Sequence, residues 1–497
     1  MERWSSRWGA LWALIGGAVG LGNFLRFPFQ AARWGGGAFL VPYLVALLVV
    51  GLPMVWIEMR LGQAGAQSGA RSAPALLRTL AGKSGWLIGL LAVYVSLAVA
   101  SYYAYLTGWT LGYTYHALLG TFSGKDLETL KGFHSEFIHK QSWIFWLLTW
   151  LLTGAILHGG LQHGVERLNR YGMPLLFLLG IGLASGTLFL GPTGRCPTCD
   201  PKEGLLYLYL PRWTALQEPA VWLAAAGQVF FSIGVGFAMY PVYAAYSGSA
   251  PILAQGTYTV AANTFAEVVL GGLIVIPLTT AFLGLPYVQQ QAGFGMGFEV
   301  MPYVLEAWGG RLLTAAWYVL LFLAGLSSLL AMGWVVLTWL AETLGGQPQR
   351  WTVPFIGVSL LLGLPPLLGY AEDTLNLYDY WAGTFLLVLA ALGHWWLFRQ
   401  AARQGLVSLE VAGPFRWIIS WLTPLFLGLI LLGSCLQPVA GDWIGAWKSL
   451  WETGHWPWAE EALPVWLAHH TFRSPWNALG LALLLGALGL IFTLRRR

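Results

Sequence analysis

The chain has 497 residues, of which only 9% are charged and 57% are hydrophobic. Soluble globular proteins carry roughly 25% charged residues, so this composition excludes a soluble protein of this length. Uncharged apolar runs such as Met173–Leu190 and Trp476–Leu494 approach the roughly 18–20 residues that a helix needs to cross a bilayer core. The sequence therefore predicts an all-α polytopic membrane protein. This excludes cytosolic enzymes, nucleic-acid binders and secreted disulfide scaffolds as first interpretations, because the net charge of +5 is small for this length and falls mostly in loops.

Apolar segments separated by polar or Gly/Pro-rich breaks predict about twelve transmembrane helices. An even number of spans puts both termini on one side, and the arginines at both ends (Arg3, Arg7 and Arg495 to Arg497) predict that this side is cytoplasmic. The first apolar segment is long and lacks an obvious cleavage site, so no cleavable signal peptide is expected. The predicted spans are 9–33, 37–66, 83–119, 142–158, 170–190, 220–246, 254–283, 310–344, 351–369, 374–399, 415–436 and 475–494.

Two of these spans are interrupted by glycines. Gly20-Leu21-Gly22 interrupts the first span and Gly234-Val235-Gly236 interrupts the sixth, at corresponding places of two five-span halves. Paired glycines can serve close helix packing alone. Broken helices at corresponding positions of two halves, however, are typical of inverted-repeat transporters whose binding site lies at the membrane midplane.

The first break offers a specific chemistry. Unwinding at Gly20–Gly22 frees backbone carbonyls, which attract a cation, and exposes the amides of a helix N-terminus, which attract a carboxylate. Asn23 adds a neutral oxygen ligand, and Arg26 is a charged residue inside a span, where ionisable residues are functional candidates. A zwitterionic amino acid beside a sodium ion fits both ends of such a break.

Several motifs extend this pattern along the chain. They are GGAVGLGNFLRFPFQAARWGGGAFLVPY from Gly16, WIE at Trp56–Glu58, SYYAYLTGW at Ser101–Trp109, GQVFFSIGVGF at Gly227–Phe237, AEVVLGG at Ala266–Gly272, AGLSS at Ala324–Ser328 and DYWAGT at Asp379–Thr384. Together they resemble the neurotransmitter:sodium symporter family, and most of all its bacterial, leucine-transporter-like amino-acid carriers.

The resemblance implies a twelve-span fold with two inverted five-helix repeats, whose first and sixth helices are broken, in the cytoplasmic membrane of a prokaryote. It covers spans one to ten and fades beyond residue 436. We therefore expect a core transporter domain at 1–436, made of both repeats and span eleven. The remainder, 437–497, is expected to be an outer Trp-rich loop followed by span twelve.

The resemblance also implies two sodium sites built from neutral oxygens. The first consists of the Ala18 carbonyl, the side chains of Asn23 and Asn263, the carbonyl and hydroxyl of Ser232, and the substrate carboxylate. The second consists of the carbonyls of Gly16, Val19 and Ala324 and the hydroxyls of Ser327 and Ser328. A substrate that completes the first site ties ion affinity to substrate affinity. The alternative role for each Ser or Asn is an interhelical hydrogen bond.

By the same resemblance, the substrate pocket lies between the two breaks, although aromatic residues on apolar helices also serve as ordinary core. Amides near Leu21 and Gly22 and the Tyr103 hydroxyl would hold the carboxylate. Monoamine carriers of the family have an Asp at the position of Gly20, so its absence implies an amino-acid substrate. The predicted lining is Gly17, Leu21, Gly22, Val99, Tyr103, Phe231, Ser232, Gly234, Phe237, Ser328 and Met332. Gly17 and Gly234 leave room for a bulky apolar or aromatic side chain.

The predicted outer gate is a charge pair between Arg26 and Asp379, with Gln228 near Arg26 and with Tyr103 and Phe237 as the lid beneath. Glu342 stands at the acidic position of the inner gate. Its basic partner in the family has only a weak match here, because Arg3 lies directly against Trp4.

Two acidic residues differ from parts of the family pattern. By the same resemblance, close bacterial relatives often have, at the position of Thr107, a Glu that faces the acid of the second span, so Glu58 is expected to lack its usual partner. Glu267 lies four residues after Asn263 and shares its helix face. Chloride-dependent members have a Ser there, so we expect a fixed carboxylate to replace chloride. The alternative is a protonated, hydrogen-bonded core carboxyl.

The function predicted from the sequence is sodium-coupled import of a neutral L-amino acid by alternating access, without chloride. The alternative is a membrane amino-acid sensor that has kept the ligand site and lost transport. No nucleophile–base pair or metal constellation stands among the midplane residues, so the chain is not expected to be an enzyme. Expected partners are the amino acid, sodium ions and the bilayer, with no nucleic acid, and the chain is expected to be a monomer or homodimer.

The cysteines and the C-terminal region lie outside these motifs. Cys196 and Cys199 can form a small disulfide in an oxidising compartment, and Cys435 is expected to be a packing residue. The segment 441–473, with His469-His470, is expected to be an outer loop with an interfacial stretch rich in Trp.

Overall fold

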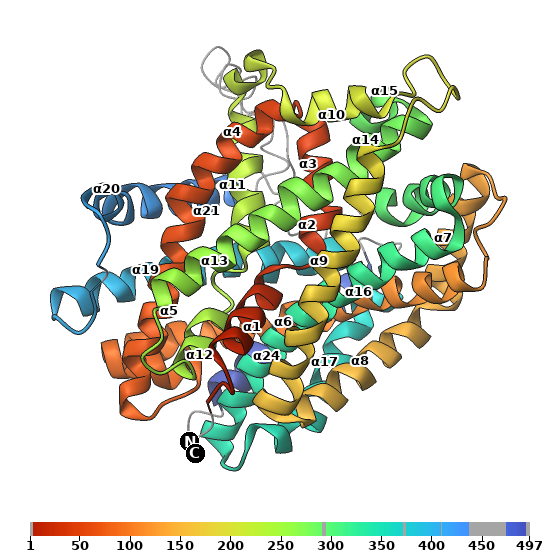
Figure 1. Cartoon of the computed structure of the whole chain (residues 1–497). Coiled ribbons are helices and arrows are strands. Elements are labelled where there is room, and N and C mark those ends of the chain that lie inside the picture. Colours follow the sequence, from red (N-terminus) through yellow and green to blue (C-terminus); the bar gives the residue numbers. More distant parts are fainter. Residues whose placement is uncertain (1–2, 291–294, 371–373, 409, 437–473, 494–497) are drawn as a thin grey trace.

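A computed structural model describes residues 3–290, 295–370, 374–408, 410–436 and 474–493. Within these ranges the chain is helical and contains no β-strand, apart from one isolated bridge between Gly36 and Pro211. Figure 1 shows a bundle of tilted helices in which the first and last helices begin and end near the same pole. The predicted fold class, an all-α membrane protein, is confirmed.

The first half of the bundle runs from α1 to α9. Its elements are α1 (Arg7–Ala18), α2 (Leu21–Leu25), α3 (Phe27–Arg33), α4 (Gly37–Ala46), the π-helical η1 (Leu47–Gly51), α5 (Leu52–Gly65), the short 3₁₀ turn η2 (Ala66–Ser68), α6 (Ala73–Leu118), α7 (Leu127–Lys140), α8 (Ser142–His158), the π-helical η3 (Leu161–Glu166) and α9 (Arg167–Leu188).

The second half and the last spans follow. Their elements are α10 (Pro201–Tyr209), η4 (Trp213–Gln217), α11 (Pro219–Ile233), α12 (Met239–Ala245), α13 (Ile252–Thr264), the π-helical η5 (Phe265–Gly271), α14 (Gly272–Leu283), α15 (Leu285–Gln290), η6 (Met296–Val300), α16 (Met301–Leu344), η7 (Pro348–Trp351), α17 (Thr352–Leu368), α18 (Thr374–Tyr378), the π-helical η9 (Asp379–Leu386), α19 (Leu387–Arg403), α20 (Gly413–Trp417), η10 (Ile418–Leu422), α21 (Thr423–Leu436) and α24 (Pro475–Thr493).

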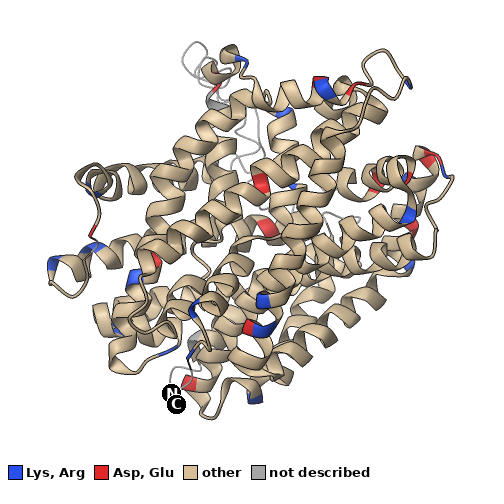
Figure 2. Ribbon diagram, viewed as in Figure 1, with Lys and Arg blue, Asp and Glu red and all other residues tan. Residues whose placement is uncertain are grey.

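These helices account for the twelve predicted spans. In the described ranges, eight helices are long and apolar enough to cross a membrane, and α1 with α2–α3 adds a ninth span, bent by 53°. Three shorter apolar helices, at Ser142–His158, Val221–Ile233 and Pro475–Ile491, supply the remaining spans. Most charged residues lie towards the ends of the bundle, whereas only a few lie within it (Figure 2).

Both predicted helix breaks are present. In the first, Val19 and Gly20 are extended, and Asn23 Oδ1 accepts a hydrogen bond of 2.8 Å from the Gly20 amide, which caps α2. In the second, Gly234, Gly236 and Ala238 have φ angles of 73°, 93° and 60°. Such left-handed backbone is accessible to glycine without strain, which explains why the chain leaves the helix at the glycines.

Two long helices cross between the breaks and carry much of the site. α6 bends at Ala81 and Gly82, and α16 bends at Gly310, so the spans begin close to the predicted residues 83 and 310. The straight parts of α6 and α16 pack along each other. They place α6 and α16 side chains against the unwound segments of spans one and six.

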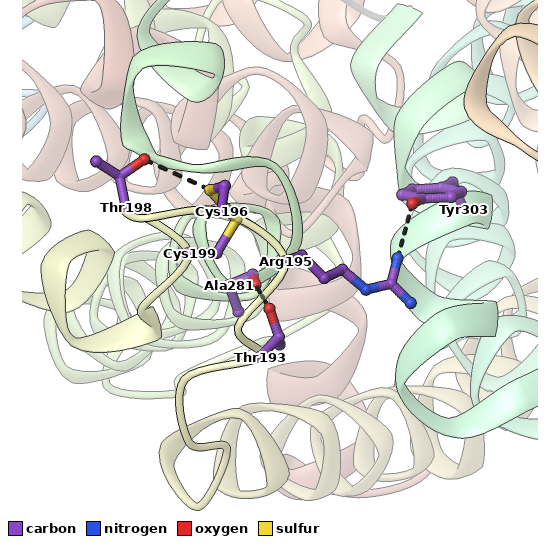
Figure 3. The surroundings of a disulfide bond; sticks show 7 residues. All are labelled: Thr193, Arg195, Cys196, Thr198, Cys199, Ala281 and Tyr303. Atoms are coloured by element: carbon purple, nitrogen blue, oxygen red, sulfur yellow. Dashed lines mark hydrogen bonds between the residues drawn. A yellow bond between two sulfur atoms is a disulfide. The ribbon is translucent and has the colours of Figure 1, made fainter.

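The loop before α10 contains a disulfide between Cys196 and Cys199 (Figure 3). Two neighbouring side chains hold this loop onto the bundle. The Thr193 hydroxyl donates to the Ala281 carbonyl at the end of α14, and the Arg195 guanidinium donates to the Tyr303 hydroxyl of α16 at 2.7 Å. Cys435 is a half-buried free thiol. Arg495 to Arg497 and the segment 441–473 lie outside the described residues.

Candidate substrate and sodium sites

One pocket lies where the two breaks face α6 and α16. Every residue predicted for the substrate site contributes to its lining except Leu21, which contributes its amide instead. The full lining is Gly17, Ala18, Gly20, Gly22, Asn23, Val99, Tyr103, Phe231, Ser232, Gly234, Phe237, Met239, Ser328 and Met332. No charged side chain is among these residues, so a charged ligand group would meet only backbone dipoles, hydroxyls and amides.

The expected carboxylate donors lie together at one end of the pocket. The Leu21 amide donates to the Tyr103 hydroxyl at 2.9 Å. A Cβ atom at Gly20 would lie 2.8 Å from that hydroxyl and 3.0 Å from Ser328 Oγ. Only glycine allows the backbone to approach both hydroxyls so closely. Gly20 therefore has a steric role, in addition to lacking the acidic side chain of the monoamine carriers.

Met239 fills the space beside the two pocket glycines. A Cβ atom at Gly17 would lie 3.1 Å from Met239 Sδ, and one at Gly234 would lie 2.5 Å from Met239 Cε. The cavity therefore has a volume of only ≈ 40 Å³, whereas ligand sites usually enclose roughly 300 Å³ or more. Met239 and Met332 must rearrange for a bulky side chain to enter, which the flexible thioether chain permits.

The side chains predicted for the first sodium site form one buried cluster. Asn23 Nδ2 donates to Asn263 Oδ1 at 2.8 Å and lies 3.3 Å from Ser232 Oγ. Asn263 Nδ2 donates to Ser232 Oγ at 2.9 Å. Ala18 shares the pocket with Asn23 and Ser232. Residues from spans one, six and seven thus bring several neutral oxygens into contact.

Glu267 lies directly behind this cluster, in the π-helical turn η5. The side chain is fully buried. Its Oε2 accepts hydrogen bonds from the Tyr43 hydroxyl at 2.6 Å and from Ser232 Oγ at 2.9 Å, while Gln228 Nε2 donates to Oε1. Ser232 therefore links the carboxylate to the cluster, and Tyr43 is a partner that the sequence did not indicate.

The residues predicted for the second sodium site surround one hydroxyl. Ser328 Oγ lies 3.5 Å from the Gly16 carbonyl oxygen, 3.4 Å from that of Val19 and 3.3 Å from that of Ala324. Ser327 Oγ donates to Ala324 at 3.0 Å. One hydroxyl has one hydrogen and cannot satisfy three carbonyls, and all three distances exceed the usual 2.7–2.8 Å. Such a group of carbonyl and hydroxyl oxygens suits a hard cation.

The predicted outer-gate pair is not in direct contact. Among the described residues no ion pair joins Arg26 to Asp379 within 4 Å. Asp379 Oδ1 instead accepts a hydrogen bond of 2.8 Å from the Tyr102 hydroxyl, and the Arg26 guanidinium lies 4.6 Å from the Phe231 ring centroid. Gln228 Nε2 donates to Glu267, and no hydrogen bond between Gln228 and Arg26 is found among the described residues.

The predicted inner-gate acid also has other partners. Glu342 accepts from the Arg71 amide at 2.6 Å and from the Ser72 hydroxyl at 2.5 Å, so it satisfies donors at the start of α6 and does not pair with Arg3. The N-terminal segment is held by Glu166 of η3, which accepts from the Ser5 amide at 2.8 Å and from its hydroxyl at 2.5 Å.

Glu58 has a partner that the sequence analysis missed. Its Oε1 accepts from His394 Nδ1 at 2.8 Å and from the Gly236 amide at 2.7 Å. His394 of α19 is thus the side chain that pairs with Glu58. A general signal was available, since an ionisable residue inside a span is a functional candidate by default. No such signal pointed to Met239, Tyr102 or Tyr43.

Comparisons with known proteins agree with this arrangement. The chain is 28% identical over 414 residues to an uncharacterized sodium-dependent transporter of Methanocaldococcus jannaschii, covering 79% of this chain and 80% of that protein. It is 26% identical over 417 residues to an uncharacterized sodium-dependent transporter of Haemophilus influenzae, covering 79% and 87%. The crystal structure of MhsT in complex with L-phenylalanine superposes with a TM-score of 0.76 at 27% identity, covering 87% of this chain and all of that one.

A family model matches most of the chain. The model described as the sodium:neurotransmitter symporter family matches residues 1–129 and 199–433, which include both helix breaks, Glu267 and Asp379. The resemblance predicted from the sequence motifs is therefore confirmed, as is the twelve-span architecture. With its broken first and sixth spans and its sodium-dependent relatives, this chain belongs to the sodium:neurotransmitter symporter family of membrane transporters.

Proposed function

We propose that this symporter imports a neutral, bulky apolar or aromatic L-amino acid together with sodium, by alternating access and without chloride. The observation that carries the proposal is the uncharged pocket between two helix breaks, with the Leu21 amide and the Tyr103 hydroxyl at one end. A free carboxylate can take these donors, and the freed carbonyls of the breaks can accept the ammonium group. A substrate without its own carboxylate would leave buried donors unsatisfied.

Two sodium ions are proposed as co-substrates. The first would bind where Asn23, Ser232 and Asn263 meet, with the Ala18 and Ser232 carbonyls and the substrate carboxylate as further ligands. The second would bind among the three carbonyls around Ser328 Oγ, with Ser327 as an additional ligand. Both groups are the oxygen ligands that hard cations prefer.

Chloride independence follows from Glu267 in this proposal. Its carboxylate is bonded to Ser232, one side chain away from the first sodium site, and can balance the sodium charge. A bound chloride would be a second anion at the same place and would be repelled.

A large hydrophobic substrate is supported by two observations. Gly17 and Gly234 carry no side chains, and the nearest side chain beside both is the flexible Met239. In addition, the similar transporter MhsT was crystallised with L-phenylalanine. L-Phenylalanine is therefore our first candidate, ahead of glycine or alanine.

The transporter is proposed to lie in a prokaryotic cytoplasmic membrane, as a monomer or homodimer with both termini cytoplasmic. Arg26 and Asp379, near Phe231 and Tyr102, would then face outward, and Glu166 and Glu342 inward. We further propose a core transporter domain at 1–436 and a C-terminal part at 437–497. The alternative, an amino-acid sensor without transport, is less well supported because the gate residues are retained.

The decisive experiment is uptake of radiolabelled L-phenylalanine into proteoliposomes under an imposed sodium gradient. Sodium-driven accumulation, inhibited by leucine, methionine and tryptophan more than by glycine, supports the proposal. Binding without accumulation would favour the sensor, and preferential inhibition by glycine would refute the substrate class. Liposomes with choline in place of sodium provide the control.

A further inference from the structure

A buried acid–base pair lies outside the predicted substrate and sodium sites. Glu58 of α5 and His394 of α19 are both fully buried, and their contacting atoms Oε1 and Nδ1 are 2.8 Å apart. They lie 336 residues apart in the chain. Glu58 Oε2 and His394 Nε2 have no hydrogen-bond partner among the described residues. One polar atom of each side chain is therefore unpaired, and the polar contacts of the pair are its own hydrogen bond and one backbone amide.

The same carboxylate oxygen holds the break of the sixth span. Glu58 Oε1 also accepts from the Gly236 amide at 2.7 Å, at the centre of the unwound segment. Two further side chains fix this segment: the Ser96 hydroxyl donates to the Phe237 carbonyl at 2.6 Å, and the Tyr240 hydroxyl donates to the Ile233 carbonyl at 2.7 Å. These bonds determine where the backbone beside the pocket lies.

Span ten approaches the break at a second point. A Cβ atom at Gly236 would lie 2.6 Å from the Leu387 carbonyl oxygen, so the break packs directly against the start of α19. His394 is two turns further along that helix and reaches the break through Glu58. The same span carries Asp379 at the start of η9. A movement of span ten would therefore act on Gly236 through both contacts.

Charge explains why the pair needs both members. The free energy required to bury an ionised carboxylate without its counter-charge is far larger than the free energy required to bury the pair. No Lys or Arg of the described chain forms an ion pair with Glu58 within 4 Å, so a protonated His394 is the group among the described residues that can balance the Glu58 charge. Tyr240, whose hydroxyl is already bonded to Ile233, is the other titratable side chain that faces it.

We propose that His394 and Glu58 form a charge-neutral junction that fastens span ten to the break of the sixth span and so positions the backbone of the substrate pocket. His394 is a positioning residue in this proposal, because it touches neither the pocket nor the proposed sodium ligands. The proposal rests on the proposed amino-acid transport function, and it adds a residue outside that site which controls substrate binding.

The test compares single and double variants. His394→Leu removes the counter-charge and leaves Glu58 alone in the interior. Glu58→Gln keeps an oxygen that can accept from Gly236 and from His394, but removes the charge. The double variant Glu58→Gln/His394→Leu has no buried charge left. Leu397→Ala, at a fully buried position one turn away on α19, is the control for simple loss of packing.

The neutral junction predicts rescue by the second substitution. We expect His394→Leu to raise the KM for phenylalanine uptake and the equilibrium Kd at least tenfold, because it breaks a buried ion pair. The double variant should stay within about threefold of wild type, since replacing both charges together is far less costly. Glu58→Gln should not repair Leu397→Ala.

Three outcomes would overturn the junction. His394→Leu could bind like wild type, the double variant could remain as weak as His394→Leu, or the loss could fall on the maximal rate alone. If His394→Leu does not fold, recovery of monodisperse protein by Glu58→Gln supports the junction and failure to recover overturns it.

Failure of the proposed function would look different. Wild-type protein that takes up no amino acid in a sodium gradient refutes that function. The junction is then tested by the unfolding temperatures of the same variants. A higher unfolding temperature of the double variant than of His394→Leu supports the junction, and equal unfolding temperatures overturn it.

Discussion

At the scale of single residues, the most specific prediction concerns Glu267 and the dependence of uptake on chloride. Its carboxylate accepts hydrogen bonds from Tyr43, Gln228 and Ser232. Glu267→Ser leaves these donors around a space that a chloride ion can fill. We expect wild-type uptake to be unchanged in chloride-free gluconate buffer. The variant should lose about tenfold or more without chloride, since buried unsatisfied donors cost about 1–3 kcal/mol each, and should recover when chloride is added.

Glu267→Gln is the matched control for this measurement. It keeps an oxygen acceptor and the side-chain volume but no charge, so it should be poorly active with or without chloride. A wild type that stops when chloride is withdrawn would contradict the proposed role of Glu267.

The position of Met239 beside the pocket glycines leads to a prediction of which substrate side chains the pocket selects. Its thioether lies where side chains at Gly17 or Gly234 would be. Met239→Ala should therefore favour the largest substrates, and we expect the ratio of tryptophan to alanine affinity to rise about tenfold, the lower end of the effect of one methylene in an apolar pocket. Competition binding measures this ratio independently of how much protein is folded. Met59→Ala, buried elsewhere in α5, should leave it unchanged.

At the scale of elements, the N-terminal segment should depend on Glu166. This carboxylate accepts from both the amide and the hydroxyl of Ser5, which joins the start of α1 to η3. Glu166→Gln replaces one acceptor by a donor, so one of the two bonds is lost. We expect hydrogen exchange of residues 3–10 to accelerate about tenfold, as one lost bond to a charged group implies.

Glu128→Gln is a suitable control because Glu128 makes an exposed ion pair with Lys131 on α7, far along the chain from this segment. It should leave exchange at residues 3–10 unchanged. Equal exchange in wild type and Glu166→Gln would show that the other contacts, such as Trp4 Nε1 donating to the Tyr243 carbonyl at 3.0 Å, hold the segment by themselves.

At the scale of the whole molecule, sodium and substrate should stabilise the fold jointly. A ligand at about 100 times its Kd stabilises the native state by roughly 2.7 kcal/mol. If the substrate completes the first sodium site, phenylalanine should raise the unfolding temperature strongly in sodium and hardly at all in choline of equal ionic strength. Thermal unfolding of the detergent-solubilised protein, with all four combinations of ion and substrate, measures this linkage.

The double variant Ser327→Ala/Ser328→Ala tests the second site in the same assay. It removes both hydroxyls near the Gly16, Val19 and Ala324 carbonyls, and we expect it to fold without sodium but to lose most of the sodium-dependent shift. An unchanged shift would assign sodium stabilisation to other residues.

Much of this protein is determined by its sequence alone. Long apolar segments without charges specify the spans, because the bilayer requires backbone hydrogen bonds to be satisfied within helices. The glycines at 20, 22, 234 and 236 specify the two breaks, because extended or left-handed backbone is least costly there. The family motifs then indicate which neutral oxygens gather around the breaks.

Only the tertiary structure decided which side chains meet. Glu58 and His394, Ser5 and Glu166, and Tyr102 and Asp379 are each more than a hundred residues apart, and no local pattern relates them. The expected Arg26–Asp379 contact gives way to other partners for the same reason, and Glu342 at the inner-gate position binds the start of α6. Periodicity specifies which face of a helix is apolar, but the rotation and height at which helices pack determine which polar atoms come within hydrogen-bonding distance.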